Sequence, residues 1–240
     1  MINKTTKTIP EHFSWMNVGG KSYITPVKRQ GFSCSCTAFG TVAALESLTH
    51  IKLAIPVGTP ESADLPVLSE GHLFYSSPGY SYKRSHLSHN RFFGWNVDEA
   101  LMTLMHRGTV PEKIYLNKKK EKREPSSDWQ KSAVRISGYR VLETRGAIKE
   151  WLSVHGPLVA TMELRMDLLF HKSDIYQHSW GPKVGEHCIC ICGYDDINHY
   201  WLCKNSWGTR WGNKGFFKVH YGECGIDERM WAIEDVELIE

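Results

Sequence analysis

The chain has 240 residues, enough for one large domain or for two small domains packed closely together. Its content of 41% hydrophobic and 23% charged residues is ordinary for a soluble globular protein, and a net charge of only +3 is low for a nucleic-acid-binding domain. No run of about 18 apolar residues is present, and the N-terminal sequence lacks the apolar core of a secretory signal, so we expect neither a membrane nor nucleic acid as a partner.

Helical patterns dominate the first half of the chain, after an irregular, turn-rich segment at residues 1–33. Apolar residues recur at helical spacing in three stretches, and Gly108 provides a stop signal at the end of the third. The predicted helices cover residues 36–48, 69–76 and 96–108. Two segments between or after them, 77–93 and 117–128, are expected to be loops. The second is rich in lysine, and it is either a solvated loop or a docking patch for an acidic partner.

After residue 132 the pattern changes to alternating strands with one short helix at 144–156. The predicted strands cover residues 132–142, 157–164, 186–195, 199–208 and 214–222. A mainly helical first half followed by a mainly antiparallel second half predicts an α+β fold with a cleft between two lobes.

Two neighbouring thiols, Cys34 and Cys36, are candidates for a nucleophile. A helix N-terminus lowers the pKa of a thiol, and Cys36 lies where the helical pattern begins. Position therefore favours Cys36 over Cys34. The alternative is that both are small buried side chains, as free cysteines often are.

A nucleophilic cysteine needs a base, and the base needs a group that orients it. His187 stands at the start of a β run, and Asn205 ends the next strand. An amide oxygen that binds one imidazole nitrogen would leave the other nitrogen facing the sulfur. Any single histidine among the 12 is more often structural, but His187 occurs together with a candidate nucleophile, Cys36, and a candidate orienting group, Asn205.

These residues resemble the papain family of cysteine peptidases, from "FSWMNVGGKSYITPVKRQG" to "KNSWGTRWGNKGFFKVHYG". The family has a glutamine six residues before its nucleophile, and Gln30 is six residues before Cys36. His187 before "GYD", and Asn205 in "NSWG", follow in the family's order. Four motifs in this order make a specific signal.

The resemblance implies a papain-like two-lobe fold in a single domain, residues 1–240, with a helical lobe at about 28–132 and a β-barrel-like lobe at about 133–230. It also implies roles. Cys36 would attack a carbonyl, and His187 would hold it as a thiolate and later protonate the leaving group. Asn205 would orient His187, with Trp207 and Ser206 supporting the site. The Gln30 side chain and the Cys36 N–H would form the oxyanion hole. No cofactor is implied.

The sequence departs from the family in its cysteines. Ser33 replaces a half-cystine, and Gly181 stands near the place of the partner expected for Cys224. The family's disulfides are therefore expected to be absent, and with seven cysteines in all this favours a reducing compartment, most simply the cytoplasm. Cys34 replaces a glycine and is either inert or a redox neighbour of Cys36.

The substrate groove departs from the family as well. Gly94 is kept from a Gly-Gly pair that binds the peptide backbone, but Trp95 replaces the second glycine and would either narrow the groove or turn away. The resemblance places Thr161, Glu186 and Cys188 around the pocket for the second residue of the acyl side.

Alternating cysteines at 188, 190 and 192 suggest a zinc site at first sight. They would share one face of a strand, but three such residues span too far to bind one ion well, so core packing is the better interpretation. His86 and His89 are likewise expected to be loop residues, and no metal is predicted.

Three functions remain compatible with the sequence. The first is a cysteine peptidase. No inhibitory segment is apparent before residue 10, and an unrestrained endopeptidase would damage the cytoplasm, so we expect its specificity to be narrow. The second is an acyltransferase that forms amides from carrier-protein thioesters, in which the basic loop at 117–124 would dock an acidic carrier protein. The third is a binding homologue without activity, which the presence of Gln30, Cys36, His187 and Asn205 disfavours.

Overall fold

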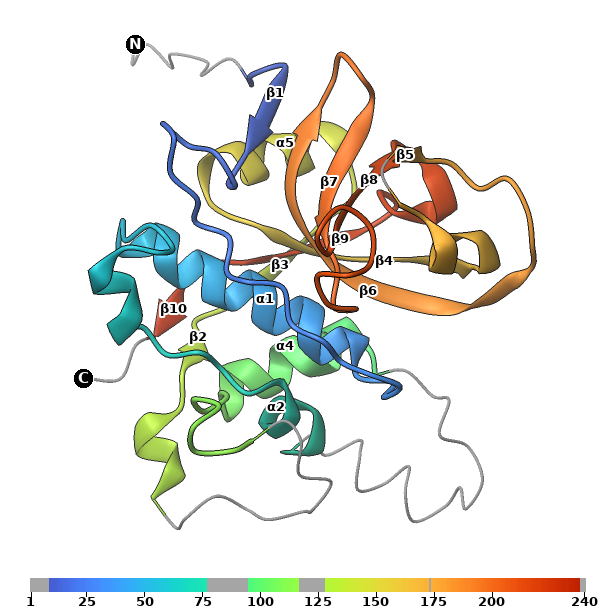
Figure 1. The fold of residues 1–240 in the computed structure, drawn as a ribbon. Helices are drawn as coiled ribbons and strands as arrows, with labels where there is room; N and C mark the ends of the chain where they lie inside the picture. The colour runs from blue at the N-terminus through green and yellow to red at the C-terminus, as the bar shows by residue number, and fades with distance from the viewer. Residues whose placement is uncertain (1–8, 77–94, 117–127, 173, 238–240) are drawn as a thin grey trace, which may run out of the picture.

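The computed structural model of the protein describes residues 9–76, 95–116, 128–172 and 174–237. Helices and strands segregate in it as the sequence predicts, with three helices on one side and a large sheet on the other (Figure 1). The predicted α+β two-lobe class is confirmed. Within the described part of the chain, no helix is both long enough and apolar enough to cross a membrane.

The helices of the first lobe are α1 (Cys36–Lys52), α2 (Glu70–Ser76) and α4 (Val97–His106). The Asn96 side chain caps α4 by accepting from the Asp98 N–H at 3.0 Å, and Gly108 follows its end with a φ of +76°. Another helix, α5 (Arg145–Val154), packs in the β lobe, and the Thr144 hydroxyl caps it. Five-residue and shorter 3-10 turns complete the set: η1 (Pro60–Asp64), η2 (Trp129–Ser132), η3 (Met166–Phe170) and η4 (Glu223–Gly225).

The large sheet has the order β3-β9-β4-β6-β7-β8-β5, with β1 paired to β6. Its pairings are antiparallel except β5 with β8, and a separate two-stranded sheet joins β10 to β2. The strands are β1 (His12–Ser14), β2 (Arg135–Ile136), β3 (Tyr139–Leu142), β4 (Leu158–Arg165), β5 (Ile175–Tyr176), β6 (Lys183–Asp195), β7 (Tyr200–Lys204), β8 (Phe216–His220), β9 (Met230–Ile233) and β10 (Val236–Glu237).

Several elements differ from the sequence prediction. The strand predicted over 132–142 is split in two, because β2 pairs with β10 while β3 pairs with β9, so the chain changes sheets between them. Strand β1 lies in the segment expected to be irregular, and β9 lies beyond the last predicted strand. The predicted loop at 77–93 lies outside the described residues, as do His86 and His89, and of the predicted loop at 117–128 only Asp128 is described.

Helix α1 lies between the two lobes, in the middle of the molecule (Figure 1). Every residue from Thr37 to His50 is buried, because the helix contacts β6 on one side and α2 and α4 on others. This placement accounts for the breadth of the apolar pattern in its sequence. It also carries the first residue of the helix, Cys36, to the boundary between the lobes.

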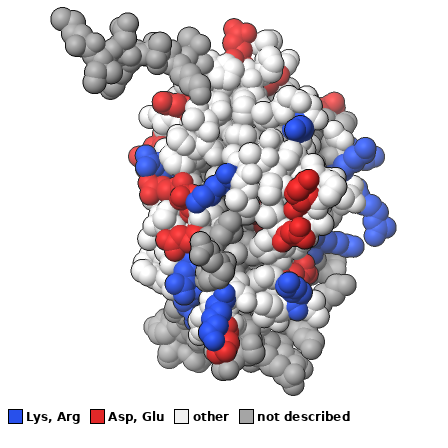
Figure 2. Space-filling view, turned by 90° about the vertical axis from the view of Figure 1, so that its left-hand side faces the viewer, with Lys and Arg blue, Asp and Glu red and all other residues white. Residues whose placement is uncertain are grey.

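Two large hydrophobic cores flank that boundary. One fills the β lobe and includes Trp201 and Tyr194, and the other joins α1, α2 and α4 to one face of β6. On the surface, Figure 2 shows acidic and basic side chains interspersed on the face that it presents, in keeping with the small net charge. The boundaries given above for the single domain and its lobes stay a prediction.

Candidate active site

Cys36 is the first residue of α1, as its position in the sequence predicts. The preceding residue, Ser35, forms no side-chain cap with the helix, and its hydroxyl lies 2.6 Å from that of Ser33 instead. The first N–H groups of a helix have no partner within it. Two backbone N–H groups interact with the thiol: that of Thr37 in the first turn of the helix and that of Cys188 on β6.

Close packing of α1 on β6 brings Cys36 toward the histidine. A Cβ on Gly40, one turn after Cys36, would lie 2.9 Å from the Cys188 sulfur and 3.3 Å from the backbone of Ile189. Only glycine permits this approach. Because Cys188 directly follows His187, the contact places the N-terminal turn of α1 beside the predicted base.

A hydrogen bond of 2.7 Å joins His187 Nε2 to Asn205 Oδ1. An amide oxygen can only accept, so Nε2 carries the proton in the neutral ring and Nδ1 keeps its lone pair. The same oxygen accepts from the Ser206 N–H at 2.8 Å, which fixes the amide. Histidine and asparagine are both buried, and the arrangement leaves Nδ1 as the basic atom.

Trp207 covers this hydrogen bond. Its ring stacks on the His187 imidazole with 4.7 Å between centroids, and Trp211 packs edge to face on Trp207, also with 4.7 Å between centroids. Shielding from water strengthens a hydrogen bond and removes competing partners. Trp207 thus lies where the sequence comparison with papain places it.

Three contacts hold Gln30 in place, and two of them are to Ser206, next to Asn205. Its N–H donates to the Ser206 carbonyl at 2.8 Å, the Ser206 hydroxyl donates to its Oε1, and its Nε2 donates to the Ser33 carbonyl at 2.9 Å. An amide nitrogen has two hydrogens, so one remains for a substrate oxygen. The predicted catalytic residues come from four separate segments. Contacts of Gln30 with Ser206, of His187 with Asn205, and of Cys36 with the Cys188 backbone bring those segments together.

Burial sets the protonation of the two reactive groups. It raises the pKa of the Cys36 thiol, although hydrogen bonds from the Cys188 and Thr37 backbones lower it. It also lowers the pKa of His187 to about 4, against the opposing effect of Asn205. Burial thus outweighs the Thr37 N–H at the start of the helix, which still lowers the pKa of the thiol as expected. Burial alone therefore favours the neutral thiol of Cys36 and the neutral imidazole of His187. Transfer of the proton from Cys36 to His187 creates a thiolate and an imidazolium together, and the attraction between these two charges offsets part of the cost of burying them.

A cavity of about 570 Å³ lies on the β lobe, and two predicted substrate-binding residues, Thr161 and Glu186, line it. Cys188 is only 1% exposed and is not among the lining residues. Trp95 turns away from the groove into the core of the helical lobe, where Thr37 donates to its carbonyl at 2.6 Å. Gly94 lies outside the described residues, and the substrate-binding assignment stays a prediction.

Charged side chains dominate the wall of this cavity. Glu163 pairs with Arg165 and, at 3.2 Å, with Lys183, and Lys183 also pairs with Glu186. Two further glutamates, Glu223 and Glu228, line it as well. Four carboxylates against two cations make the cavity acidic on balance.

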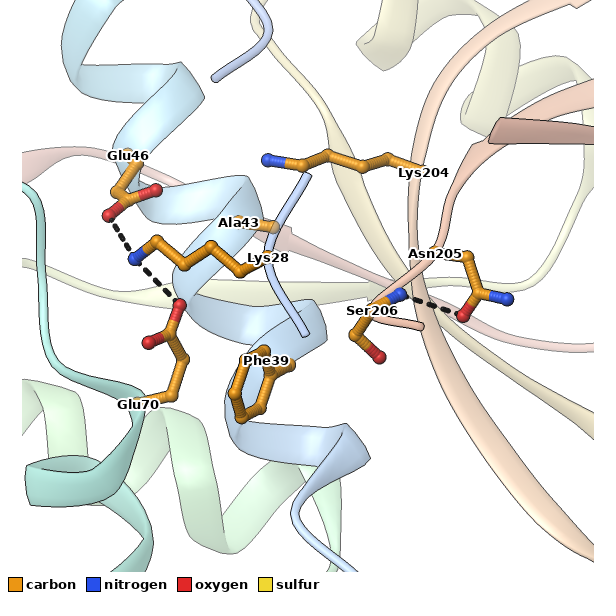
Figure 3. Close-up of a pocket in the computed structure, with 8 residues that line it drawn as sticks. All are labelled: Lys28, Phe39, Ala43, Glu46, Glu70, Lys204, Asn205 and Ser206. Atoms are coloured by element: carbon orange, nitrogen blue, oxygen red, sulfur yellow. Dashed lines mark hydrogen bonds and ion pairs between the residues drawn. The ribbon is translucent and has the colours of Figure 1, made fainter. Parts of the chain in front are cut away.

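Behind Asn205 lies a cluster of buried charges that sequence reasoning missed (Figure 3). Lys28 Nζ lies 2.8 Å from both Glu46 and Glu70, which reach it from α1 and from the start of α2. Lys204, one residue before Asn205, donates to the Thr25 hydroxyl at 2.8 Å. Burial lowers the pKa of Lys204, whereas the two carboxylates outweigh burial and raise that of Lys28. The sequence offered one sign of this cluster: charged residues, such as Glu46 and Lys204, interrupt otherwise apolar helical and strand patterns.

None of the seven cysteines forms a disulfide, and all seven lie within the described residues. Cys188 and Cys190 pack in the core of the helical lobe, but Cys192 packs with Ile191 in the core of the β lobe. The prediction that 188, 190 and 192 share one face is therefore wrong at Cys192. The pairing of β6 with β7 shifts register between Ile191 and Gly193, which interrupts the alternation of the strand.

Comparison with known proteins shows the family of the chain. The model of a family described as papain family cysteine protease matches residues 9–233. The chain belongs to that family. Pro-cathepsin H of Bos taurus is 28% identical over 234 residues, which cover 92% of this chain and 63% of the relative. The viral cathepsin of Cydia pomonella granulosis virus is 30% identical, covering 91% of this chain and 60% of the relative.

Solved structures share the fold of this papain-family chain. Procathepsin L 3 of Tenebrio molitor superimposes with a TM-score of 0.74 at 22% identity, covering 96% of this chain and 72% of that one. Bromelain protease of Ananas comosus, in complex with the E64 inhibitor, has a TM-score of 0.70 at 23% identity, with 94% and 99% covered. The chain spans about three fifths of the length of the two curated relatives above, and it spans less than a third of cathepsin B-like cysteine proteinase 1 of Ostertagia ostertagi, with which it shares 36% identity over 112 residues.

Proposed function

We propose that the chain is a cysteine peptidase of narrow specificity that acts through a Cys36 thioester. One observation carries the proposal above all. The bond from His187 Nε2 to Asn205 Oδ1 leaves Nδ1 as the free base. His187 directly precedes Cys188, the residue of β6 that packs against Gly40 of α1. A base with a fixed tautomer beside a helix-terminal thiol is the arrangement that nucleophilic catalysis by cysteine requires.

The reaction follows from these positions. His187 Nδ1 takes the proton of Cys36 as the sulfur attacks the substrate carbonyl. The oxygen of the tetrahedral intermediate then receives hydrogen bonds from the Cys36 N–H and from the free hydrogen of Gln30 Nε2. His187 next gives the proton to the leaving amine, which departs and leaves a thioester on Cys36. A water molecule, deprotonated by the same nitrogen, hydrolyses the thioester and restores the thiol.

Narrow specificity is supported by the cavity beside Thr161. Its wall is mostly polar and charged, so an apolar side chain of the substrate would have to desolvate carboxylates without providing hydrogen bonds. Selectivity of this kind arises from leaving polar groups unpaired when the wrong substrate binds.

The cysteines, none of which forms a disulfide, support our proposal that the enzyme acts in the cytoplasm.

The acyltransferase alternative shares every step up to the thioester and differs only in the acceptor, an amine in place of water. The segment offered for docking an acidic carrier protein, residues 117–124, lies outside the described residues. No contact of the described residues favours that acceptor, so hydrolysis is the proposed reaction.

The test is hydrolysis of a diverse library of internally quenched peptides under reducing conditions, by the wild type and by Cys36→Ala. We expect cleavage that is lost in the variant, and Cys34→Ala serves as the matched control that retains it. Cleavage that survives Cys36→Ala would refute the proposal. No cleavage, combined with rapid alkylation of Cys36, would direct attention to thioesters and amine acceptors instead. Neither cleavage nor alkylation would indicate a binding homologue without activity.

A further inference from the structure

Cys34 is a second thiol beside the nucleophile, and the proposed reaction does not use it. It precedes Cys36 by two residues, in the turn that leads into α1, where the papain family has a glycine. Both thiols are partly exposed, whereas four of the other five are buried. Cys224, the remaining one, lies on η4 in the β lobe. An oxidant in solution can therefore reach Cys34 and Cys36 together at the active site.

The turn before α1 folds the chain tightly enough to bring side chains two residues apart together. Ser35 has a φ of −99° and a ψ of 17°, a bend that brings the Cα atoms on either side of it within the range of about 4.4–6.8 Å that disulfides span. The hydroxyls of Ser33 and Ser35 lie 2.6 Å apart, and Cys34 and Cys36 have the same spacing in the same turn. Burial is the main cause that raises the pKa of Cys36, and the charge of Cys34 adds to it, which requires that the two sulfurs lie near each other.

Cys36 is the thiol that reacts first with an oxidant. The thiolate is the reactive form of a cysteine, and His187 Nδ1 is placed to take the proton of Cys36. The product with a peroxide is a sulfenic acid, and more peroxide converts it irreversibly to a sulfinic acid unless another thiol reacts with it first. A neighbouring thiol therefore decides whether oxidation of Cys36 is reversible.

Two cysteines approach Cys36, and they differ in how well their thiols can react. The Cys188 N–H bonds to the Cys36 sulfur, but the Cys188 side chain is 1% exposed and packs in the helical core beside Gly40. Burial raises the pKa of Cys188 well above its usual value, so its thiolate is scarce. Cys34 is partly exposed and lies in the turn outside the helix, so its side chain can move without unpacking the core.

We propose that Cys34 is the resolving thiol of a reversible redox switch, in which a peroxide converts Cys34 and Cys36 to a disulfide that turns the enzyme off. The Cys36 thiolate attacks one peroxide oxygen, the O–O bond breaks, and the leaving hydroxide takes the proton held by His187. The Cys34 thiolate then attacks the sulfur of the Cys36 sulfenic acid, the S–O bond breaks, and the hydroxide leaves as water with the proton of Cys34. In sum, two thiols and one hydrogen peroxide give one disulfide and two molecules of water.

The bridge stops catalysis in two ways and is easily reversed. It removes the nucleophile, and it pulls on the turn that fixes the oxyanion donor, because the Ser33 hydroxyl and carbonyl bond to Gln30 at 2.7 and 2.9 Å. A disulfide across a single residue is strained, and strained disulfides are reduced readily by the thiols of the cytoplasm, where we propose that the enzyme acts. The inference goes beyond the proposed peptidase function, since it needs a reactive Cys36 but no peptide substrate.

The test treats the reduced protein with hydrogen peroxide, blocks the remaining thiols with N-ethylmaleimide and digests the product with trypsin for mass spectrometry. Residues 30–52 form one tryptic peptide, and its two cysteines are Cys34 and Cys36. We expect this peptide to lose two hydrogens and to take up no N-ethylmaleimide after oxidation, although it takes up two before. Cys34→Ala and Cys36→Ala prevent the bridge. Cys224→Ala is the matched control, because it removes another partly exposed thiol and leaves the bridge intact.

Recovery of activity gives the second readout. After peroxide has abolished peptide cleavage, dithiothreitol restores most of it in the wild type and in Cys224→Ala, each compared with its own activity before oxidation. In Cys34→Ala the recovered fraction is about tenfold lower, because the Cys36 sulfenic acid proceeds to irreversible products.

Three results would overturn the inference. One is a sulfinic or sulfonic acid on Cys36 beside an unmodified Cys34 in the oxidised wild type. Another is a bridge from the peptide 30–52 to the peptide 184–204, which would assign the resolving role to a cysteine of β6 or β7. The third is recovery in Cys34→Ala equal to that in the wild type. Formation of the bridge in a protein that cleaves no peptide would support this inference and overturn the proposed function alone.

Discussion

Replacing Glu46 with glutamine removes one charge from the buried cluster with almost no change in shape. Glu46 Oε1 accepts from Lys28 Nζ at 2.8 Å and from the Leu68 N–H at 2.7 Å, and Oε2 accepts from the Thr25 hydroxyl at 3.0 Å. An amide keeps one acceptor oxygen but turns the other into a donor. The Thr25 hydroxyl would then have no acceptor, while it still receives Lys204 Nζ at 2.8 Å.

The expected loss follows from the burial of the cluster. Removing one partner of a buried ion pair typically costs about 3–5 kcal/mol, because an uncompensated charge stays behind. Lys28 keeps its contact of 2.8 Å with Glu70, so the lower end of that range applies to Glu46→Gln. About 3 kcal/mol corresponds to a fall in Tm of about 6–12 °C for a chain of this length.

Urea unfolding followed by tryptophan fluorescence measures this loss. A Cys36→Ser background prevents self-digestion during the experiment. Glu234→Gln is the matched control, because Glu234 pairs with Arg140 at the surface, where a salt bridge contributes no more than about 1 kcal/mol. A loss in Glu46→Gln no larger than that in Glu234→Gln would refute the view that the cluster is a desolvated network holding the Asn205 strand end against α1.

Three further predictions concern packing, acid stability and the oxyanion. Gly40→Ala destabilises the fold by about 1–3 kcal/mol in urea unfolding, because its Cβ meets β6, whereas Gly146→Ala, with open space around it, is neutral or stabilising. Burial lowers the pKa of His72 to about 4, with Arg107 contributing, so the unfolded state binds the extra proton as the pH falls from about 6.5 to 4, and stability is lost over that window. His187, with its pKa also lowered to about 4, contributes to the same loss. His72→Phe should therefore reduce, without abolishing, the fall of the urea midpoint between about pH 7 and 4, and an unchanged slope would contradict this assignment. Gln30→Ala lowers kcat for peptide cleavage by about 100- to 1,000-fold, and a change confined to KM would argue against a role in the oxyanion hole.

The helices and strands closest to the active site were predictable, because their signals are local. The apolar pattern from Cys36 onward predicts α1, and alternation predicts β6 and β7 on either side of a turn. Spacing and motif order singled out Cys36, His187 and Asn205. These signals need only a few consecutive residues. At these positions the local sequence pattern and the tertiary packing favour the same helix or strand, so the local prediction holds.

Features that depend on partners distant in the chain were not predictable in this way. Strands β1 and β9 are short and have no period of their own to detect, and they exist because β6, β4 and β3 provide their hydrogen-bond partners. The orientation of Trp95 was left open by the sequence, and packing in the helical core decides it. Cys192 was assigned to the wrong face, because alternation cannot register a bulge that arises from pairing with β7.

The sequence by itself thus determined which groups would carry out the chemistry. Residue type and the order of the motifs along the chain are enough to identify the thiol, the imidazole and the amide that acyl transfer needs. Only the tertiary structure decided their electrostatics and their surroundings. Burial raises the pKa of Cys36 and lowers that of His187, and it is a property of everything packed around them rather than of their neighbours in sequence. The buried cluster around Lys28 depends on the same physical cause. It brings together segments that are separate in the chain, and only folding sets the distances between them.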